Sequence, residues 1–118
     1  MLGSRTHYVE RRLGVKLPQD YAAFIERHGI HSVNGVEVYG YDERVVDPEK
    51  IPCVIGATHL YGRDYRLEEG ILVISHTGVE DIIVLLDTST GSIFEAGADT
   101  RRKVASSFNE WIAELETR

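Results

Sequence analysis

Histidine and cysteine are the side chains here most able to bind metal or act as nucleophiles, and the chain has five histidines and one cysteine. His28 and His31 are three residues apart, a spacing that puts two metal ligands on one face of a continuous helix. Gly29 lies between them and is expected to end the helix, so the two rings should not share a face. A helix-end role is predicted for His28, since a cation is favourable in the last helical turn. No metal site and no cofactor are expected.

Two other arrangements would support hydrolysis. Cys53 would be a nucleophile if a cation lowered its pKa, but nothing electropositive adjoins it, so a small buried residue is the better interpretation. Asp87 with His76 would form an acid–base pair if the two side chains met in space beside a pocket. A turn role is more plausible for Asp87, because an aspartate can bond the backbone two residues ahead. The sequence therefore favours a protein that is not an enzyme.

Tyrosine combined with carboxylates is the more informative pattern. Six tyrosines outnumber three phenylalanines, and tyrosine is enriched at protein interfaces because it joins a large apolar body to a polar tip. Tyr21 and Tyr39 are assigned to the core, whereas for Tyr41 and Tyr65 an interface role and a core-capping role remain equally open. Acidic neighbours would suit recognition of Lys and Arg. The candidate partner-binding residues are Tyr41, Asp42, Glu43, Asp64, Tyr65, Glu80 and Asp81.

Composition limits the classes of function. The length of 118 residues predicts a single domain over residues 1–118, and 42% hydrophobic with 27% charged residues is ordinary for a globular protein. No apolar run approaches the roughly 20 residues that span a bilayer, and the start has no secretory pattern. A single cysteine excludes an internal disulfide and fits a reducing compartment. We therefore expect a cytoplasmic protein without a membrane partner, either a monomer or a weak homodimer.

The formal net charge of −6 bears on the partner. Binding of nucleic acid depends on Lys and Arg that neutralise phosphates, so direct binding of RNA or DNA is not expected. The same charge would steer the protein toward a basic partner. A simpler interpretation, that moderate negative charge keeps a small protein in solution, stays open on composition alone.

Helices are predicted at both ends of the chain and in the middle. Residues 17–29 carry a start at Pro18, apolar residues at helical spacing and a stop at Gly29. An earlier short helix is expected to end at Leu13, and a third is expected over 54–65. At the C-terminus a capping box with its first residue at Ser107 opens a fourth helix.

Strands are predicted between these helices. The alternation over 35–41 is typical of a half-buried strand, whereas residues 30–34 look like a turn. The continuous β-prone runs 71–74 and 81–87 indicate central strands covered on both faces, and 92–95 follows as a return strand. The expected fold class is α+β, with a mainly antiparallel sheet flanked by helices.

This order of motifs resembles the SUKH superfamily, which includes the Smi/Knr-type fungal cell-wall regulators and many bacterial immunity proteins. The resemblance covers nearly the whole chain. Leu17-Pro18-x-Asp20-Tyr21-x-x-Phe24-Ile25 is similar to the opening helix of the family, and Gly35-Val36-Glu37-Val38-Tyr39-Gly40 to its first strand. Ala105-x-Ser107-Phe108-x-x-Trp111-Ile112 is similar to its closing helix. In the middle of the chain the matching residues, in order, are Thr58, Arg63, Ile71 to Ile74, Leu86-Asp87 and Gly91.

The resemblance implies a non-catalytic interaction module and brings no catalytic residues with it. In bacteria such a module most often binds and neutralises one cognate toxin, frequently a nuclease or a nucleic-acid deaminase. The leading hypothesis is therefore an immunity protein that occludes the basic active site of a toxin. Two alternatives remain: a regulatory scaffold with a housekeeping partner, and a small hydrolase.

Overall fold

Four helices and six strands make up the chain in a computed structural model that describes residues 3–118. The helices are α1 (Ser4–Leu13), α2 (Gln19–His28), α3 (Val54–Tyr65) and α4 (Phe108–Glu116). The strands are β1 (His31–Val33), β2 (Val36–Val38), β3 (Ile71–His76), β4 (Ile83–Asp87), β5 (Ile93–Ala96) and β6 (Arg101–Ala105). No helix in this part of the chain is both long enough and apolar enough to cross a membrane.

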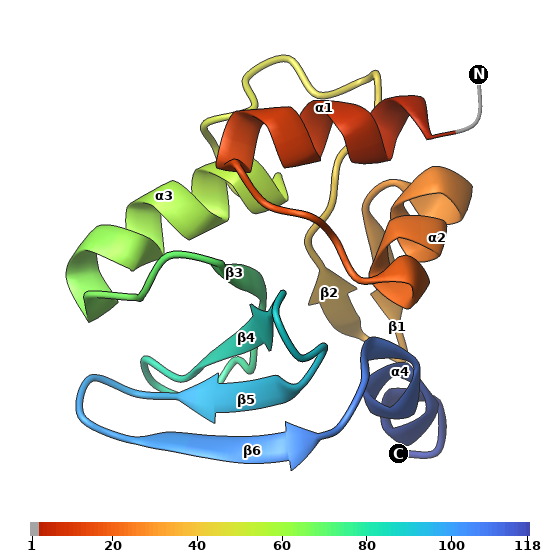
Figure 1. Cartoon of the computed structure of the whole chain (residues 1–118). Coiled ribbons are helices and arrows are strands. Elements are labelled where there is room, and N and C mark those ends of the chain that lie inside the picture. Colours follow the sequence, from red (N-terminus) through yellow and green to blue (C-terminus); the bar gives the residue numbers. More distant parts are fainter. Residues whose placement is uncertain (1–2) are drawn as a thin grey trace.

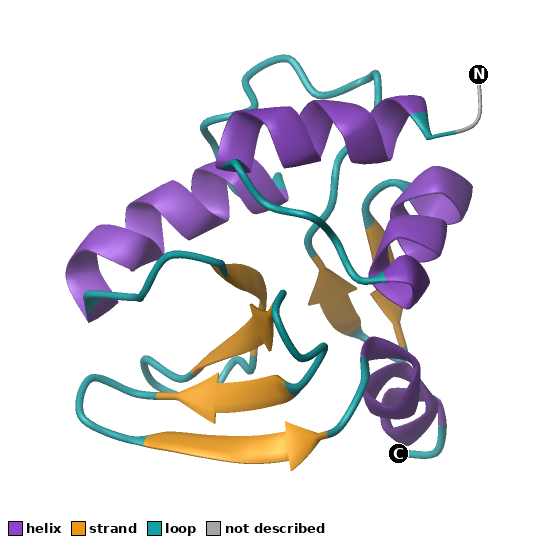
Figure 2. Ribbon diagram, in the orientation of Figure 1, coloured by secondary structure: helices purple, strands orange, loops and turns teal. Residues whose placement is uncertain are grey.

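The strands form two antiparallel sheets. β3, β4, β5 and β6 lie side by side in that order, and β1 pairs with β2 in a separate hairpin. Figure 1 shows α1 and α3 above the four-stranded sheet, with α2 and α4 beside the hairpin. Figure 2 shows the same division between helices and sheet. The α+β class with an antiparallel sheet flanked by helices is therefore confirmed.

Two strands were not expected from the sequence. β1 occupies part of the segment assigned to a turn, and it joins β2 through Asn34 and Gly35, which have φ angles of 50° and 85°. Asn-Gly is the preferred pair for a two-residue hairpin turn, since both positions need positive φ. β6 has three consecutive charged residues, Arg101 to Lys103, all exposed at the sheet edge. A charged edge strand lacks the alternation that identifies a half-buried one.

The prediction that β3 is a central strand is wrong, although its burial was anticipated. β3 is the edge of the four-stranded sheet, and β4 is central. Residues 71–75 are nevertheless all buried. The end of β2 covers the edge, because the Tyr39 N–H donates to the Ile74 carbonyl at 2.7 Å and the Ser75 hydroxyl donates to the Glu37 carbonyl at 2.6 Å.

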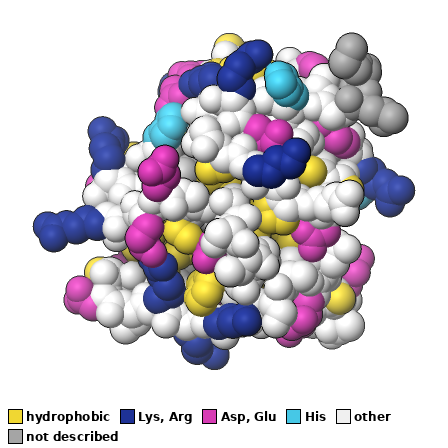
Figure 3. Space-filling model, viewed as in Figure 1, with side chains coloured by type: hydrophobic (Ala, Val, Ile, Leu, Met, Phe, Trp, Pro, Cys, Tyr) yellow, Lys and Arg dark blue, Asp and Glu magenta, His cyan; other side chains and the backbone are white. Residues whose placement is uncertain are grey.

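The core lies between the helices, the four-stranded sheet and the hairpin, and all four helices contribute buried side chains to it. Tyr21 is fully buried, as expected, and its hydroxyl donates to the Tyr39 carbonyl at 2.7 Å. Its ring meets Phe108 edge-on, with centroids 5.0 Å apart. The predicted cap of α4 is present, since the Ser107 hydroxyl accepts from the Glu110 N–H at 3.1 Å. Figure 3 shows hydrophobic side chains mainly along the middle of one face, between the helices and the sheet.

Candidate partner-binding surface

The seven candidate residues fall into two groups that lie on different elements. Residues 41–43 follow the hairpin and contact α1. Asp64 and Tyr65 are at the end of α3, and Tyr65 contacts Asp81 of the β3–β4 turn, which also carries Glu80. The two groups differ in whether their carboxylates are free.

In the first group the carboxylates are used inside the molecule. Asp42 is only 4% exposed, and Arg44 Nη2 lies 3.0 Å from its carboxylate. Glu43 is exposed, but its carboxylate lies 2.8 Å from the guanidinium of Arg5. Hydrogen bonding from Arg44 and from Arg5 lowers the pKa of the Asp42 and Glu43 carboxyls respectively. Neither carboxylate is free to pair with a partner's cation without losing an internal one.

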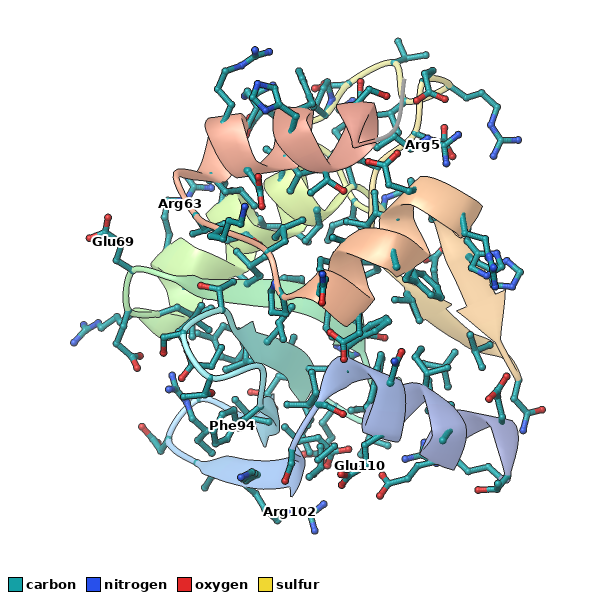
Figure 4. The ribbon with its side chains drawn as sticks, turned by 45° about the vertical axis from the view of Figure 1, so that its right-hand side comes forward. Arg5, Arg63, Glu69, Phe94, Arg102 and Glu110 are labelled. Carbon is teal, nitrogen blue, oxygen red and sulfur yellow. The ribbon has the colours of Figure 1, made fainter. Side chains whose placement is uncertain are left out.

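Arg5 explains why this group is structural. Besides Glu43, its guanidinium donates to the carbonyls of Ile25 at 3.1 Å and Glu26 at 3.3 Å, in the last turn of α2. Figure 4 shows Arg5 between the start of α1 and the end of α2. The Ile25 carbonyl also accepts from the Gly29 N–H at 2.8 Å, and a cation is favourable at this end of a helix, so Arg5 ties α1 to the last turn of α2. Tyr41 is half-buried and stacks on Tyr8 of α1 with centroids 4.5 Å apart, so it packs rather than projects.

The second group forms a surface that we call the acidic surface. It consists of the end of α3 and the β3–β4 turn, and its residues are Tyr61, Asp64, Tyr65, Val79, Glu80 and Asp81. The Tyr65 hydroxyl donates to the Asp81 carbonyl, which ties the helix to the turn. Burial of the ring, together with the charge of Asp81, raises the pKa of Tyr65. Tyr61 meets Tyr65 edge-on at 5.9 Å.

The turn that carries this surface is held by its own hydrogen bonds. The Thr77 hydroxyl donates to the Ile82 carbonyl at 2.9 Å and accepts from the Val79 N–H at 3.1 Å. The Gly78 N–H donates to His76 Nδ1 at 2.9 Å. Glu80 completes the turn at a φ of 47°. A turn fixed in this way gives up little conformational entropy when a partner binds.

The acidic surface keeps its negative charge available. Asp64, Glu80 and Asp81 are exposed and take part in none of the ion pairs found within residues 3–118. Arg101, at the start of β6, is neutralised by Glu68 through two bonds of 2.9 and 2.8 Å. That pairing lowers the pKa of Glu68 to about 2.

Two residues of this surface were missed by reasoning from the sequence. Val79 is 57% exposed at the tip of the turn, beside the carboxylates. Its position after Gly78 in a stretch between two strands was a usable signal, because an apolar residue at a turn has no core to face. Tyr61 belongs with Tyr65 to the pattern of tyrosines beside carboxylates, but it is not among the partner-binding residues predicted from the sequence. Together they add apolar contact area beside the carboxylates, and interfaces combine an apolar, aromatic-rich centre with a polar rim.

The catalytic alternatives find no support in the geometry. His76 pairs with Ile83 and Asp87 pairs with Ile71, at opposite ends of the β3–β4 ladder. Along the strand direction, His76 and Asp87 are therefore four residues apart, a distance of about 13 Å. The Asp87 carboxylate accepts from the Ser89 N–H at 2.9 Å, which is the predicted turn role. Cys53 is fully buried, and burial raises the pKa of its thiol.

One expectation about the histidines is wrong. The His28 and His31 rings are stacked, with centroids 4.5 Å apart and planes 13° from parallel. Gly29 does end α2, but its φ of 70° turns the chain so that β1 begins beside the last turn of the helix. The described residues contain no group of three or more His, Cys, Asp or Glu that could hold a metal ion. The pair is therefore a local contact at the end of α2.

Stability is expected to decrease slightly as the pH falls below about 6.5, because of this pair. Partial burial, then the charges of His31 and Arg27, lower the folded-state pKa of His28 from 6.5. As the pH falls, His28 therefore takes up its proton in the unfolded chain before it does so in the folded protein. The free energy of unfolding that this histidine contributes above pH 6.5 is lost as the pH falls through its folded-state pKa. The expected loss is below about 1 kcal/mol, because both rings are exposed.

Denaturant unfolding between pH 7 and about pH 5.5, above the range where carboxylates titrate, measures this effect. His28→Gln should flatten the pH dependence. His7→Gln, which changes an exposed histidine of α1, is the control and should leave the dependence unchanged. Equal slopes for the wild type and His28→Gln would contradict the explanation.

Comparison with known sequences extends over most of these elements. The model of the SMI1 / KNR4 family (SUKH-1) matches residues 7–114, from α1 into α4. No curated protein matches the chain.

Proposed function

The chain belongs to the SMI1/KNR4 family (SUKH-1), a family of immunity-type proteins, and from this premise we propose that it binds and neutralises one cognate toxin. The partner would be a basic protein that acts on nucleic acid, a nuclease or a deaminase. The protein would work in the cytoplasm by binding alone, without catalysis. A housekeeping partner is the alternative for a member of this family.

The observation that carries the proposal is the acidic surface. Its three carboxylates have no cation partner within residues 3–118, whereas the carboxylates of Asp42 and Glu43 already have one each. Nucleic-acid enzymes present Lys and Arg where the phosphates bind. A surface with free carboxylates is complementary to such a site, so we assign the contact to Asp64, Glu80 and Asp81 and not to residues 41–43.

The mechanism would combine attraction with occlusion. Unpaired carboxylates speed the encounter with a positive partner, and this effect weakens with salt. The aromatic and apolar side chains Tyr61, Tyr65 and Val79 would then exclude water around the contact. Tyrosines are among the residues that supply most of the binding energy at an interface centre, while the charges fix partner and orientation. Bound there, the protein would cover the groove that receives the phosphates.

A binding titration against the toxin domain encoded beside the gene tests the proposal. We expect a one-to-one complex whose association rate falls by about tenfold or more when ionic strength rises from 0.01 to 0.3 M. A complex with no salt dependence would remove the electrostatic mechanism. Absence of binding, with the toxin domain shown to be active, would leave the housekeeping alternative.

A further inference from the structure

A second surface of opposite character surrounds the loop that precedes α3. Four large hydrophobic side chains are exposed among residues 3–118, and three of them lie here: Val46 at 97%, Ile51 at 37% and Leu60 at 41%. Single exposed apolar residues are common, but a group of them marks an interaction site. We call this the loop face, and its residues are Arg44, Val46, Lys50, Ile51, Leu60 and Arg63.

Two hollows lie next to each other on the loop face. One, of about 670 Å³, lies between the loop and α3 and is lined by Ile51, Leu60 and Arg63 among others. The other, of about 660 Å³, lies within the loop and includes Val46 and Ile51. Lys50 and Ile51 line both hollows, so the two adjoin. Two adjacent hollows can receive two apolar side chains from one segment of a partner.

The loop holds this shape because it rests directly on α3. A Cβ added to Gly56 would lie 2.3 Å from the carbonyl carbon of Glu49, so the loop backbone fits only against a glycine. The Glu49 carboxylate contacts Arg12 of α1 and also His59 Nδ1, the latter at 2.7 Å. Within the loop, the Cys53 N–H donates to the Lys50 carbonyl at 3.0 Å. A surface fixed from three sides needs little ordering when it binds.

Among the described residues, the rim has two unpaired cations, Lys50 and Arg63, and one exposed carboxylate outside any ion pair, that of Asp47, which accepts from the Glu49 N–H at 3.0 Å. Glu49 is engaged by Arg12 and His59, and the Asp42 carboxylate is buried against Arg44. Lys50 and Arg63 take part in no ion pair within the described residues. In Figure 4 Arg63 projects from α3 on the side next to α1. A partner that places carboxylates at this rim would complement it.

From these observations we propose that the loop face docks an acidic amphipathic segment of a partner protein. Two apolar side chains of the segment occupy the two hollows, and carboxylates beside them pair with Lys50 and Arg63. This contact is separate from the acidic surface and does not depend on the function proposed above. The unpaired side chains of the acidic surface are all carboxylates, whereas those of the loop face include the cations Lys50 and Arg63, so the two surfaces select different partner chemistries.

A pair of synthetic peptides tests the proposal. Both have leucine along one helix face. One carries glutamate on its other face, and the second carries lysine in place of every glutamate. Titration into the ¹⁵N-labelled protein should shift the amide resonances of Val46, Ile51 and Leu60 with the glutamate peptide only. Equal shifts with both peptides, shifts confined to other residues, or no shifts would overturn the proposal.

Variants separate the apolar from the charged contribution. Val46→Ser with Leu60→Ser should weaken binding of the glutamate peptide about tenfold, whereas Val79→Ser, an exposed valine on the acidic surface, should not. Lys50→Glu with Arg63→Glu should exchange the preference, so that the lysine peptide binds instead. An unchanged preference would contradict the assignment of charge. Concentration-dependent shifts at Val46 without peptide would show that a second copy occupies the face, which also overturns the proposal.

Discussion

Gly56→Ala is expected to destabilise the protein by about 3 kcal/mol or more. The added methyl would lie 2.3 Å from the Glu49 carbonyl carbon and 2.4 Å from the Lys50 nitrogen. Both are backbone atoms, so no flexible side chain can move aside. Either α3 shifts away from the sheet or the loop lifts off the helix. The measurement is the denaturant midpoint of unfolding, read by tryptophan fluorescence.

The same helix offers a matched control at Gly62. A Cβ at this position has no atom within 4 Å, so the substitution costs no packing. Gly62→Ala should stabilise the protein by up to about 1 kcal/mol, because alanine loses less backbone entropy in a helix. If both substitutions stabilised the protein, the loop would not rest on α3 as described.

Reversing two charges on the acidic surface is expected to have the largest effect on function. Glu80→Lys with Asp81→Lys would place two cations opposite the basic site of the proposed toxin. Like charges across an interface cost several kcal/mol, so affinity should fall by about 100-fold or more. Both residues are exposed, and neither forms an ion pair with another residue that the structure describes, so the fold should be preserved. Calorimetric titration with the toxin domain measures the loss.

The control is a double variant that changes the net charge by the same amount on a surface away from the acidic surface. Glu114→Lys with Glu116→Lys does so, because both residues are exposed near the end of α4. Lysine is also favourable in the last turn of a helix, so this variant should remain folded. An equal loss of affinity in both double variants would mean that overall charge, not the acidic surface, governs binding.

The helices were predictable from the sequence because their signals are local. Ser107 accepts from the N–H three residues ahead, and α3 spans the predicted residues 54–65 despite its two glycines. Glycine normally weakens a helix, but Gly56 allows the loop backbone to pack directly against α3, and this tertiary contact offsets the low helix propensity of glycine. β1 and β6 were not predicted, the first because the Asn34-Gly35 hairpin signal was overlooked and the second because its residues are charged.

The site was predictable only in part, because pairing between distant residues cannot be read from neighbouring positions. In the sequence, Asp42-Glu43 and Glu80-Asp81 are equivalent signals, since each is a pair of adjacent acidic residues in a polar stretch. Glu43 pairs with Arg5, which is 38 residues away in the sequence, whereas Glu80 and Asp81 take part in none of the ion pairs of the described residues. Tertiary position likewise brings Tyr65 to Asp81 and exposes Val79 beside them.

Survival of cells that express the neighbouring toxin is the most direct measurement of the central claim, that this chain neutralises a toxin through the acidic surface. Cells carrying the wild-type protein or Glu114→Lys with Glu116→Lys should survive. Cells carrying Glu80→Lys with Asp81→Lys, expressed at the same level, should die. Survival with all three proteins would contradict the role of the acidic surface, and death with the wild type would contradict the immunity function itself.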